Sequence, residues 1–126
     1  MSIAGRHSMI ELYGCPRALL DDLPRVRAAM LEAVTVSRGQ LVGECSHRFS
    51  PHGVTMVGLL AESHISIHTW PEHGYAAADV FTCGEHGEPE LACRRLAQLL
   101  AAERFELRTV DRGRPGGLEQ PLSSPA

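Results

Sequence analysis

Two runs of alternating side chains in the middle of the sequence constrain the fold most strongly. The runs are His64–Trp70 and Tyr75–Cys83, and the linker between them reads Pro-Glu-His-Gly over 71–74. Alternation between two faces is typical of half-buried strands, and a short linker containing Pro and Gly is typical of a hairpin. The pattern therefore predicts an antiparallel β-hairpin.

The register of this hairpin follows if Trp70 pairs with Tyr75 across the linker. The pairs are then Trp70–Tyr75, His68–Ala77, Ser66–Asp79 and His64–Phe81. Cys83 falls opposite Glu62 and beside Ser63, and cross-strand neighbours have Cβ atoms about 4.5–5.5 Å apart. Strict alternation puts Ser63 and His68 on opposite faces, so a contact between them requires a bend or bulge at the Glu62–Ser63 junction.

The rest of the chain supplies two helices and four more strands. Apolar spacing predicts one helix that begins after Asp21 and Asp22 and ends near Gly39, and another that begins at 88–90. Further strands are expected at 9–15, 40–49, 54–61 and 105–110, and the strand at 54–61 is apolar on both faces. The order β-α-β-β-β-β-α-β predicts an α+β domain, with two helices covering one face of an antiparallel sheet.

Composition limits the class of protein. A chain of 126 residues with 44% hydrophobic content fits one domain, which we place at 1–112, and the Pro- and Gly-rich tail at 113–126 has little to bury. The net charge of −3 gives no sign of nucleic-acid binding. Because there is neither a long apolar run nor a signal peptide, we expect no membrane segment and a cytoplasmic location.

Metal binding and disulfides are not expected. His64 and His68 lie four residues apart on the same strand, which separates them by about 13 Å and is too far for one zinc ion. The four cysteines show no C-x-x-C spacing, so we expect thiols in a reducing compartment. Taken singly, Ser63, Trp70 and Cys83 are ordinary surface or packing residues, and only their combination suggests a reactive site.

Several segments resemble one known family. They are Gly5-Arg6-His7, Tyr13-Gly14-Cys15, His47–Pro51, Glu62–Glu72 and Gly74–Gly84. In order and spacing they are similar to the prokaryotic S-adenosylmethionine decarboxylase proenzymes, from Gly5 to about Val110. That family makes the aminopropyl donor for spermidine synthesis.

The resemblance implies a self-cleaving chain. The Ser63 hydroxyl attacks the Glu62 carbonyl, the resulting ester is eliminated, and the dehydroalanine at position 63 hydrolyses to a pyruvoyl group. Residues 1–62 and 63–126 then form two chains. The pyruvoyl ketone forms a Schiff base with the substrate amine and accepts the electrons left by CO₂, as pyridoxal phosphate does.

The family also implies roles for individual side chains. His68 is the base in the elimination, the hydroxyl of Thr55 helps to position the ester, and Cys83 returns a proton to the substrate carbon. Phe49 and Trp70 stack on adenine, and Glu72 holds the ribose hydroxyls.

Two departures from the family pattern leave alternatives open. Thr55-Met56 replaces the usual Ser-Gly, and Met56 would fill volume in the pocket, so the same cofactor acting on ornithine or arginine is the main alternative. An unprocessed pseudoenzyme that only binds a partner is the other, and it would be expected to lack Ser63, His68 or Cys83.

The exposed face of the predicted sheet indicates how the protein assembles. A sheet with helices on one face leaves an apolar face, notably around 54–60, that a symmetric partner would cover. We expect a homodimer of cleaved protomers that forms an α/β/β/α sandwich, as the family also implies, with the sites near the subunit interface.

Overall fold

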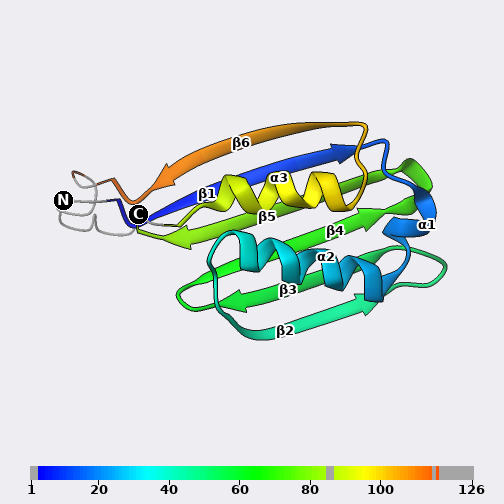
Figure 1. Cartoon of the computed structure of the whole chain (residues 1–126), viewed down its shortest axis with the longest axis horizontal. Coiled ribbons are helices and arrows are strands. Elements are labelled where there is room, and N and C mark those ends of the chain that lie inside the picture. The colour runs from blue at the N-terminus through cyan, green and yellow to red at the C-terminus, as the bar shows by residue number, and fades with distance from the viewer. Residues whose placement is uncertain (1–2, 85–86, 115, 117–126) are drawn as a thin grey trace, which may run out of the picture.

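A computed structural model describes residues 3–84, 87–114 and 116 of the chain. Its elements are β1 (Gly5–Tyr13), α1 (Arg17–Leu20), α2 (Leu23–Val36), β2 (Leu41–Arg48), β3 (Val54–Leu60), β4 (Ser63–Trp70), a one-turn 3₁₀ helix (Pro71–His73), β5 (Tyr75–Cys83), α3 (Pro89–Leu99) and β6 (Arg104–Arg112). The strands form one antiparallel sheet in the order β2-β3-β4-β5-β1-β6. Figure 1 shows α2 and α3 on the same face of this sheet, which confirms the predicted α+β class.

The central hairpin has the predicted register. Trp70 pairs with Tyr75, and the ladder continues to His64 and Phe81 as the linker length implied. Gly74 closes the linker with a φ of +61°, in the left-handed region that glycine enters at little cost. The hairpin therefore fixes which end of the sheet holds each candidate residue.

The first long helix is capped by only one of the two aspartates expected there. Asp22 Oδ1 accepts the Arg25 N–H at 3.2 Å, and Pro24 lies in the first turn, where a missing N–H does no harm. Asp21 instead contacts the segment after β2. The four-residue α1 was not predicted, because one helical turn carries too little periodicity to detect.

The two faces of the sheet differ in burial. On the helix side the core contains apolar residues of strands and helices, among them Ile10, Leu12, Val26, Met30, Met56, Ile65, Ile67, Val80 and Leu96. On the other side, which we call the open face, Val57 is 38% exposed and Leu59 57% exposed. Since β3 carries apolar side chains on both faces, the prediction for that strand is confirmed.

The outer strands are longer than predicted. β1 begins at Gly5 rather than Met9, and β6 runs on to Arg112 rather than ending at Val110. Most of the expected tail at 113–126 lies outside the described residues, with 113, 114 and 116 the exceptions. In the described part of the chain, no helix has the length and apolar content that crossing a bilayer requires.

Candidate active site

The Glu62–Ser63 bond lies in a tight turn. Leu60 pairs with Ser63 across the β3–β4 hairpin, so Ala61 and Glu62 alone make the connection. Glu62 has a φ of +62°, a left-handed conformation that costs a non-glycine residue on the order of 1 kcal/mol. The expected bend is therefore a strained two-residue turn, and the register shift between β2 and β3 lies elsewhere, at Leu41/Gly43.

Cys83 contacts both sides of that bond. Its backbone N–H donates to Ser63 Oγ at 3.2 Å, and its thiol donates to the carbonyl oxygen of Glu62. Glu62 and Cys83 are exposed and Ser63 is half-buried, so the group is open to reagents. The predicted proximity of the three residues is confirmed, and the thiol lies where it can polarise the Glu62 carbonyl.

A cavity of about 420 Å³ opens beside these residues. Ser63 and Cys83 line one side of it, and Ser37–Gln40, which follow α2, line another. A cavity of a few hundred Å³ is the size of a small-molecule site. Phe49, Trp70 and Glu72, the expected substrate contacts, are not among its lining residues.

The other candidate side chains gather at the opposite end of the hairpin. His68 pairs with Thr55 across β3 and β4, and Thr55 Oγ1 lies 3.0 Å from His68 Nδ1. Trp70 ends β4 and is 40% exposed, while Phe49 follows β2 at the same end of the sheet and is 47% exposed. The five residues Phe49, Thr55, His68, Trp70 and Glu72 thus share one end.

The carboxylate of Glu72 is paired rather than free. His52 Nε2 lies 2.8 Å from Glu72 Oε2. The N–H of Glu72 itself, and then His52, hold the pKa of this carboxyl below its usual range. The carboxylate is therefore charged at neutral pH, and both of its oxygens can accept hydrogen bonds from hydroxyl groups.

Ser63 and His68 do not meet within one chain. Five residues of strand separate them, which corresponds to about 16 Å, and Trp70 lies about 23 Å from Ser63 by the same rise. The turn at Glu62 does not shorten this path because β4 is continuous from Ser63 to Trp70. The Ser63–His68 contact that a bend was expected to allow is therefore absent from the described chain. We call the end with Glu62, Ser63 and Cys83 the reactive end, and the end with Phe49, Thr55, His68, Trp70 and Glu72 the binding end.

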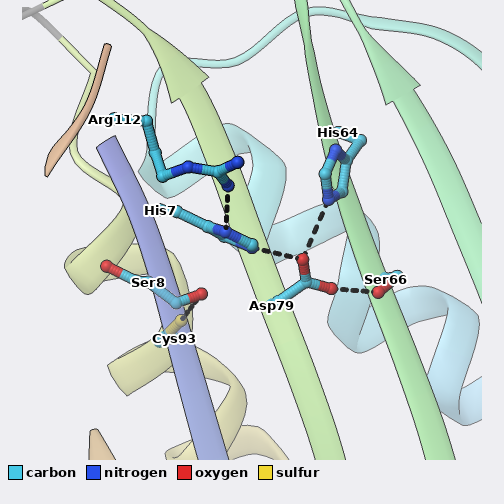
Figure 2. Close-up of polar contacts among 7 residues, drawn as sticks. All are labelled: His7, Ser8, His64, Ser66, Asp79, Cys93 and Arg112. Carbon is cyan, nitrogen blue, oxygen red and sulfur yellow. Dashed lines mark hydrogen bonds and ion pairs between the residues drawn. The ribbon is translucent and has the colours of Figure 1, made fainter. Parts of the chain in front are cut away.

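A polar cluster that the sequence did not predict lies on the open face, one residue from Ser63. Figure 2 shows His7 of β1 and His64 of β4 pointing at Asp79 of β5. Their Nε2 atoms lie 2.6 and 2.9 Å from Asp79 Oδ2, and the Ser66 hydroxyl donates to Asp79 Oδ1. Burial alone would raise the pKa of Asp79, but the hydrogen bonds from Ser66 and the two histidines outweigh it and lower that pKa.

These three side chains have the residue types of a metal site, and their donor atoms lie within 4.8 Å of one another. However, Arg112 Nη1 lies 3.3 Å from His7 Nδ1, and a guanidinium can only donate. Nδ1 is then the accepting nitrogen, and the proton of His7 sits on Nε2, the atom that would have to bind the metal. The geometry favours a hydrogen-bonded cluster over a metal centre.

Comparisons with known proteins agree with the family resemblance read from the sequence. A family model described as S-adenosylmethionine decarboxylase matches residues 6–113. The S-adenosylmethionine decarboxylase proenzyme of Parasynechococcus marenigrum (strain WH8102) is 46% identical over 123 residues, 98% of this chain and 96% of the relative. That of Methanococcus maripaludis is 47% identical over 113 residues, 90% of this chain and 93% of the relative.

A solved structure is similar as well. The crystal structure of the adenosylmethionine decarboxylase from Aquifex aeolicus VF5 matches with a TM-score of 0.85 and 33% identity, and the match covers 98% of this chain and 100% of that one. The likeness therefore extends over the whole sheet and both long helices.

Proposed function

The chain belongs to the S-adenosylmethionine decarboxylase family, and we propose that it cleaves itself before Ser63 to make a pyruvoyl cofactor for that reaction. The enzyme is a carboxy-lyase that converts S-adenosyl-L-methionine to CO₂ and decarboxylated S-adenosylmethionine. The decarboxylated product is the aminopropyl donor for spermidine synthesis. Relatives named proenzymes support processing of the chain.

The observation that carries this proposal is the pair of Cys83 contacts at the Glu62–Ser63 bond. Attack of Ser63 Oγ on the Glu62 carbonyl makes an oxyanion, which the Cys83 thiol stabilises as a donor. The C–N bond then breaks, and residue 62 is left as an ester on Ser63. Loss of the Ser63 α-proton to His68 expels the Glu62 carboxylate, and hydrolysis of the dehydroalanine releases ammonia and leaves the pyruvoyl group.

Cys83 has a second task once the cofactor exists. A pyruvoyl group at position 63 would supply a ketone to bind the substrate amine and to accept the electrons left when CO₂ departs. Cys83 lies beside that position, and its thiol would return a proton to the α-carbon of the substrate. The cavity of about 420 Å³ next to both residues fits the amino-acid part of the substrate.

The binding end fits the nucleoside part. Phe49 and Trp70 offer exposed aromatic faces for adenine and for the sulfonium charge, and Glu72 offers a charged carboxylate for the ribose hydroxyls. Ornithine and arginine have neither base nor ribose and would use none of these groups. The relatives described above carry S-adenosylmethionine decarboxylase names, which do not support the alternative amino acids.

Because the reactive and binding ends lie so far apart, one substrate cannot use both ends of the same chain. A second copy resolves this, since a two-fold axis between two open faces, perpendicular to β4, sets the end of β4 that begins at Ser63 in one copy against the end that bears His68 and Trp70 in the other. The exposed Val57 and Leu59 would then be covered. We therefore infer a homodimer of cleaved protomers, an α/β/β/α sandwich in which each site is shared.

Intact mass under denaturing conditions tests the processing step. The purified protein is expected to give two species, residues 1–62 and residues 63–126 with a blocked N-terminus. Ser63→Ala is expected to give one full-length species while folding normally, because no hydroxyl remains to attack. A single species from the native sequence, or cleavage of the Ser63→Ala chain at the same bond, would refute the proposal.

A further inference from the structure

His52 has no part in the chemistry above, yet it contacts the binding end directly. It lies in the segment between β2 and β3, and its Nε2 is 2.8 Å from Glu72 Oε2. Both side chains are partly shielded, at 26% and 33% relative exposure. The contact therefore joins two connections that are twenty residues apart in the sequence and that flank the candidate nucleoside site.

The same segment is held from its other side by Asp21. Asp21 Oδ2 accepts from Arg48 Nη2 at 2.7 Å, and Asp21 Oδ1 accepts from the Gly53 N–H at 2.9 Å. The N–H of Phe49 in turn donates to the Gly53 carbonyl at 2.7 Å. The chain on either side of His52 is thus anchored, so the imidazole is presented to Glu72 from a fixed backbone.

The Glu72 carboxylate has one local contact, its own backbone N–H, which is the leading cause of its lowered pKa. Glu72 lies in the one-turn 3₁₀ helix Pro71–His73, and its side chain is one-third exposed. A glutamate in such a place has several exposed rotamers, and choosing one of them lowers affinity by the entropy that is lost. The imidazole of His52, 2.8 Å from Oε2, adds to the contact from the Glu72 N–H, narrows the choice of rotamer in advance and leaves acceptor sites on the carboxylate for a hydroxyl pair.

We propose that His52 is a positioning residue for substrate binding, which orients the Glu72 carboxylate toward the ribose hydroxyls of the nucleoside. This inference rests on the proposed role of Glu72 in holding ribose. His52 itself touches no reacting atom. It acts through Glu72, and together with Asp21 it ties the segment bearing Phe49 to the turn that follows Trp70.

The test uses the processed enzyme and two nucleoside probes that lack the reacting amino acid. One is 5′-methylthioadenosine, and the other is its 2′,3′-dideoxy analogue, which has no ribose hydroxyls. His52→Leu removes the N–H donor and keeps bulk, while His52→Gln keeps an N–H donor. Affinities are measured by calorimetry, and KM and kcat for S-adenosylmethionine are measured beside them.

His52→Leu is expected to weaken binding of methylthioadenosine about three- to tenfold, part of the value of one hydrogen bond to a charged group. Its affinity for the dideoxy analogue is expected to stay unchanged, and KM should rise while kcat is kept. His52→Gln should restore most of the affinity. His73→Gln, which removes an imidazole next to Glu72 in the same turn, is the matched control and should bind both probes as the native enzyme does.

Glu72→Gln separates failure of this inference from failure of the proposed site. If Glu72→Gln weakens methylthioadenosine binding and His52→Leu does not, His52 is not a positioning residue. If His52→Leu weakens both probes equally, it acts on the pocket in general and the inference is wrong. If Glu72→Gln changes neither affinity, the ribose role of Glu72 fails, and the role of His52 fails with it.

Discussion

The two ends of the β4–β5 hairpin hold their functional groups by different means. At the reactive end, backbone geometry dominates, since Glu62 is left-handed and the Cys83 N–H meets Ser63 Oγ. At the binding end, side chains hold one another, as in the Thr55–His68 contact at 3.0 Å and the His52–Glu72 pair at 2.8 Å. In the proposed function this difference has a reason, because the first end breaks one bond once and the second recognises the nucleoside in every turnover.

Substitutions at the two ends should therefore have different consequences. A change at the reactive end removes a chemical step, whereas a change at the binding end alters the rate or affinity by the value of one contact. His68 and Thr55 depart from this division, because both lie at the binding end of their own chain and act on the reactive end of another in the proposed dimer.

The largest effects are expected from Cys83→Ala and His68→Ala. His68→Ala should stop before the pyruvoyl group forms and accumulate an ester that hydroxylamine cleaves, because a general base contributes about 10²–10⁴-fold. Cys83→Ala should slow processing by about 10- to 100-fold, since S–H is a weaker donor than the N–H groups of most oxyanion sites. Gel analysis with and without hydroxylamine distinguishes the two variants.

In the fraction of Cys83→Ala that is processed, decarboxylation should be weak and activity should fall with turnover. A proton delivered to the cofactor carbon instead of the substrate leaves an amine in place of the ketone. Full and lasting activity in this variant would remove Cys83 from the mechanism, and normal pyruvoyl formation in His68→Ala would do the same for the histidine.

A smaller effect is expected at Thr55, whose hydroxyl contacts His68 Nδ1. Thr55→Val keeps the branched shape and removes the hydroxyl, so processing should slow about tenfold, the equivalent of one hydrogen bond. Thr55→Ser restores the hydroxyl and should process at the native rate. Equal rates for the valine and serine variants would show that the contact does not serve the reaction.

The cluster on the open face is expected to act on stability. Asp79→Asn should lower the free energy of unfolding at pH 7 by about 1–3 kcal/mol, since it removes the charge that Ser66, His7 and His64 surround. The folded-state pKa of Asp79 is below its usual value, so this stability is present above about pH 4 and is lost as the pH falls through the folded pKa. Denaturant titration should therefore show a smaller difference in the free energy of unfolding between variant and native protein at pH 3 than at pH 7.

The control for that measurement is Asp111→Asn, which removes the partner of Arg6 at 3.3 Å in a pair about one-third exposed. A pair this open to water should change stability by less than about 1 kcal/mol. If the Asp79 variant behaved like this control at pH 7, the cluster would have no stabilising role.

The smallest effect is a difference in thiol reactivity. Burial raises the pKa of Cys15 to about 11, and burial followed by the nearby Asp79 and Glu90 charges raises the pKa of Cys93 to about 12. Cys45 and Cys83 are exposed. Alkylation of the native protein at pH 8 should therefore spare Cys15 and Cys93, and peptide mapping should find them modified only in denaturant. Rapid modification of Cys93 in the folded protein would contradict the burial of its side chain beneath the sheet.

The sequence predicted the hairpin better than any other part of the molecule. A four-residue linker and strict alternation fix the register, and the Ser66–Asp79 and Glu62–Cys83 neighbours follow from it without knowledge of the other strands. The resemblance to a family supplied the roles of Thr55, Phe49 and Glu72, which neither spacing nor composition distinguishes from ordinary surface residues.

Contacts between distant strands could not be predicted from the sequence. His7 and Asp79 are 72 positions apart, and their contact depends on β1 pairing with β5, a register that no turn specifies. The start of β1 at Met9 was also placed four residues late, which left His7 off the strand altogether. His52 was missed for a similar reason, because its partner Glu72 belongs to a different connection.

Mixed dimers test the central claim, that reactive and binding ends of different copies make one site. Ser63→Ala and His68→Ala chains would be co-expressed with different tags, dimers carrying both tags isolated, and intact masses measured under denaturing conditions. The His68→Ala chain, which stays uncleaved alone, is expected to be cleaved in mixed dimers because its Ser63 and Cys83 meet His68 of the other chain. A His68→Ala chain that stays whole in mixed dimers, or cleaves without a partner, would contradict the shared site.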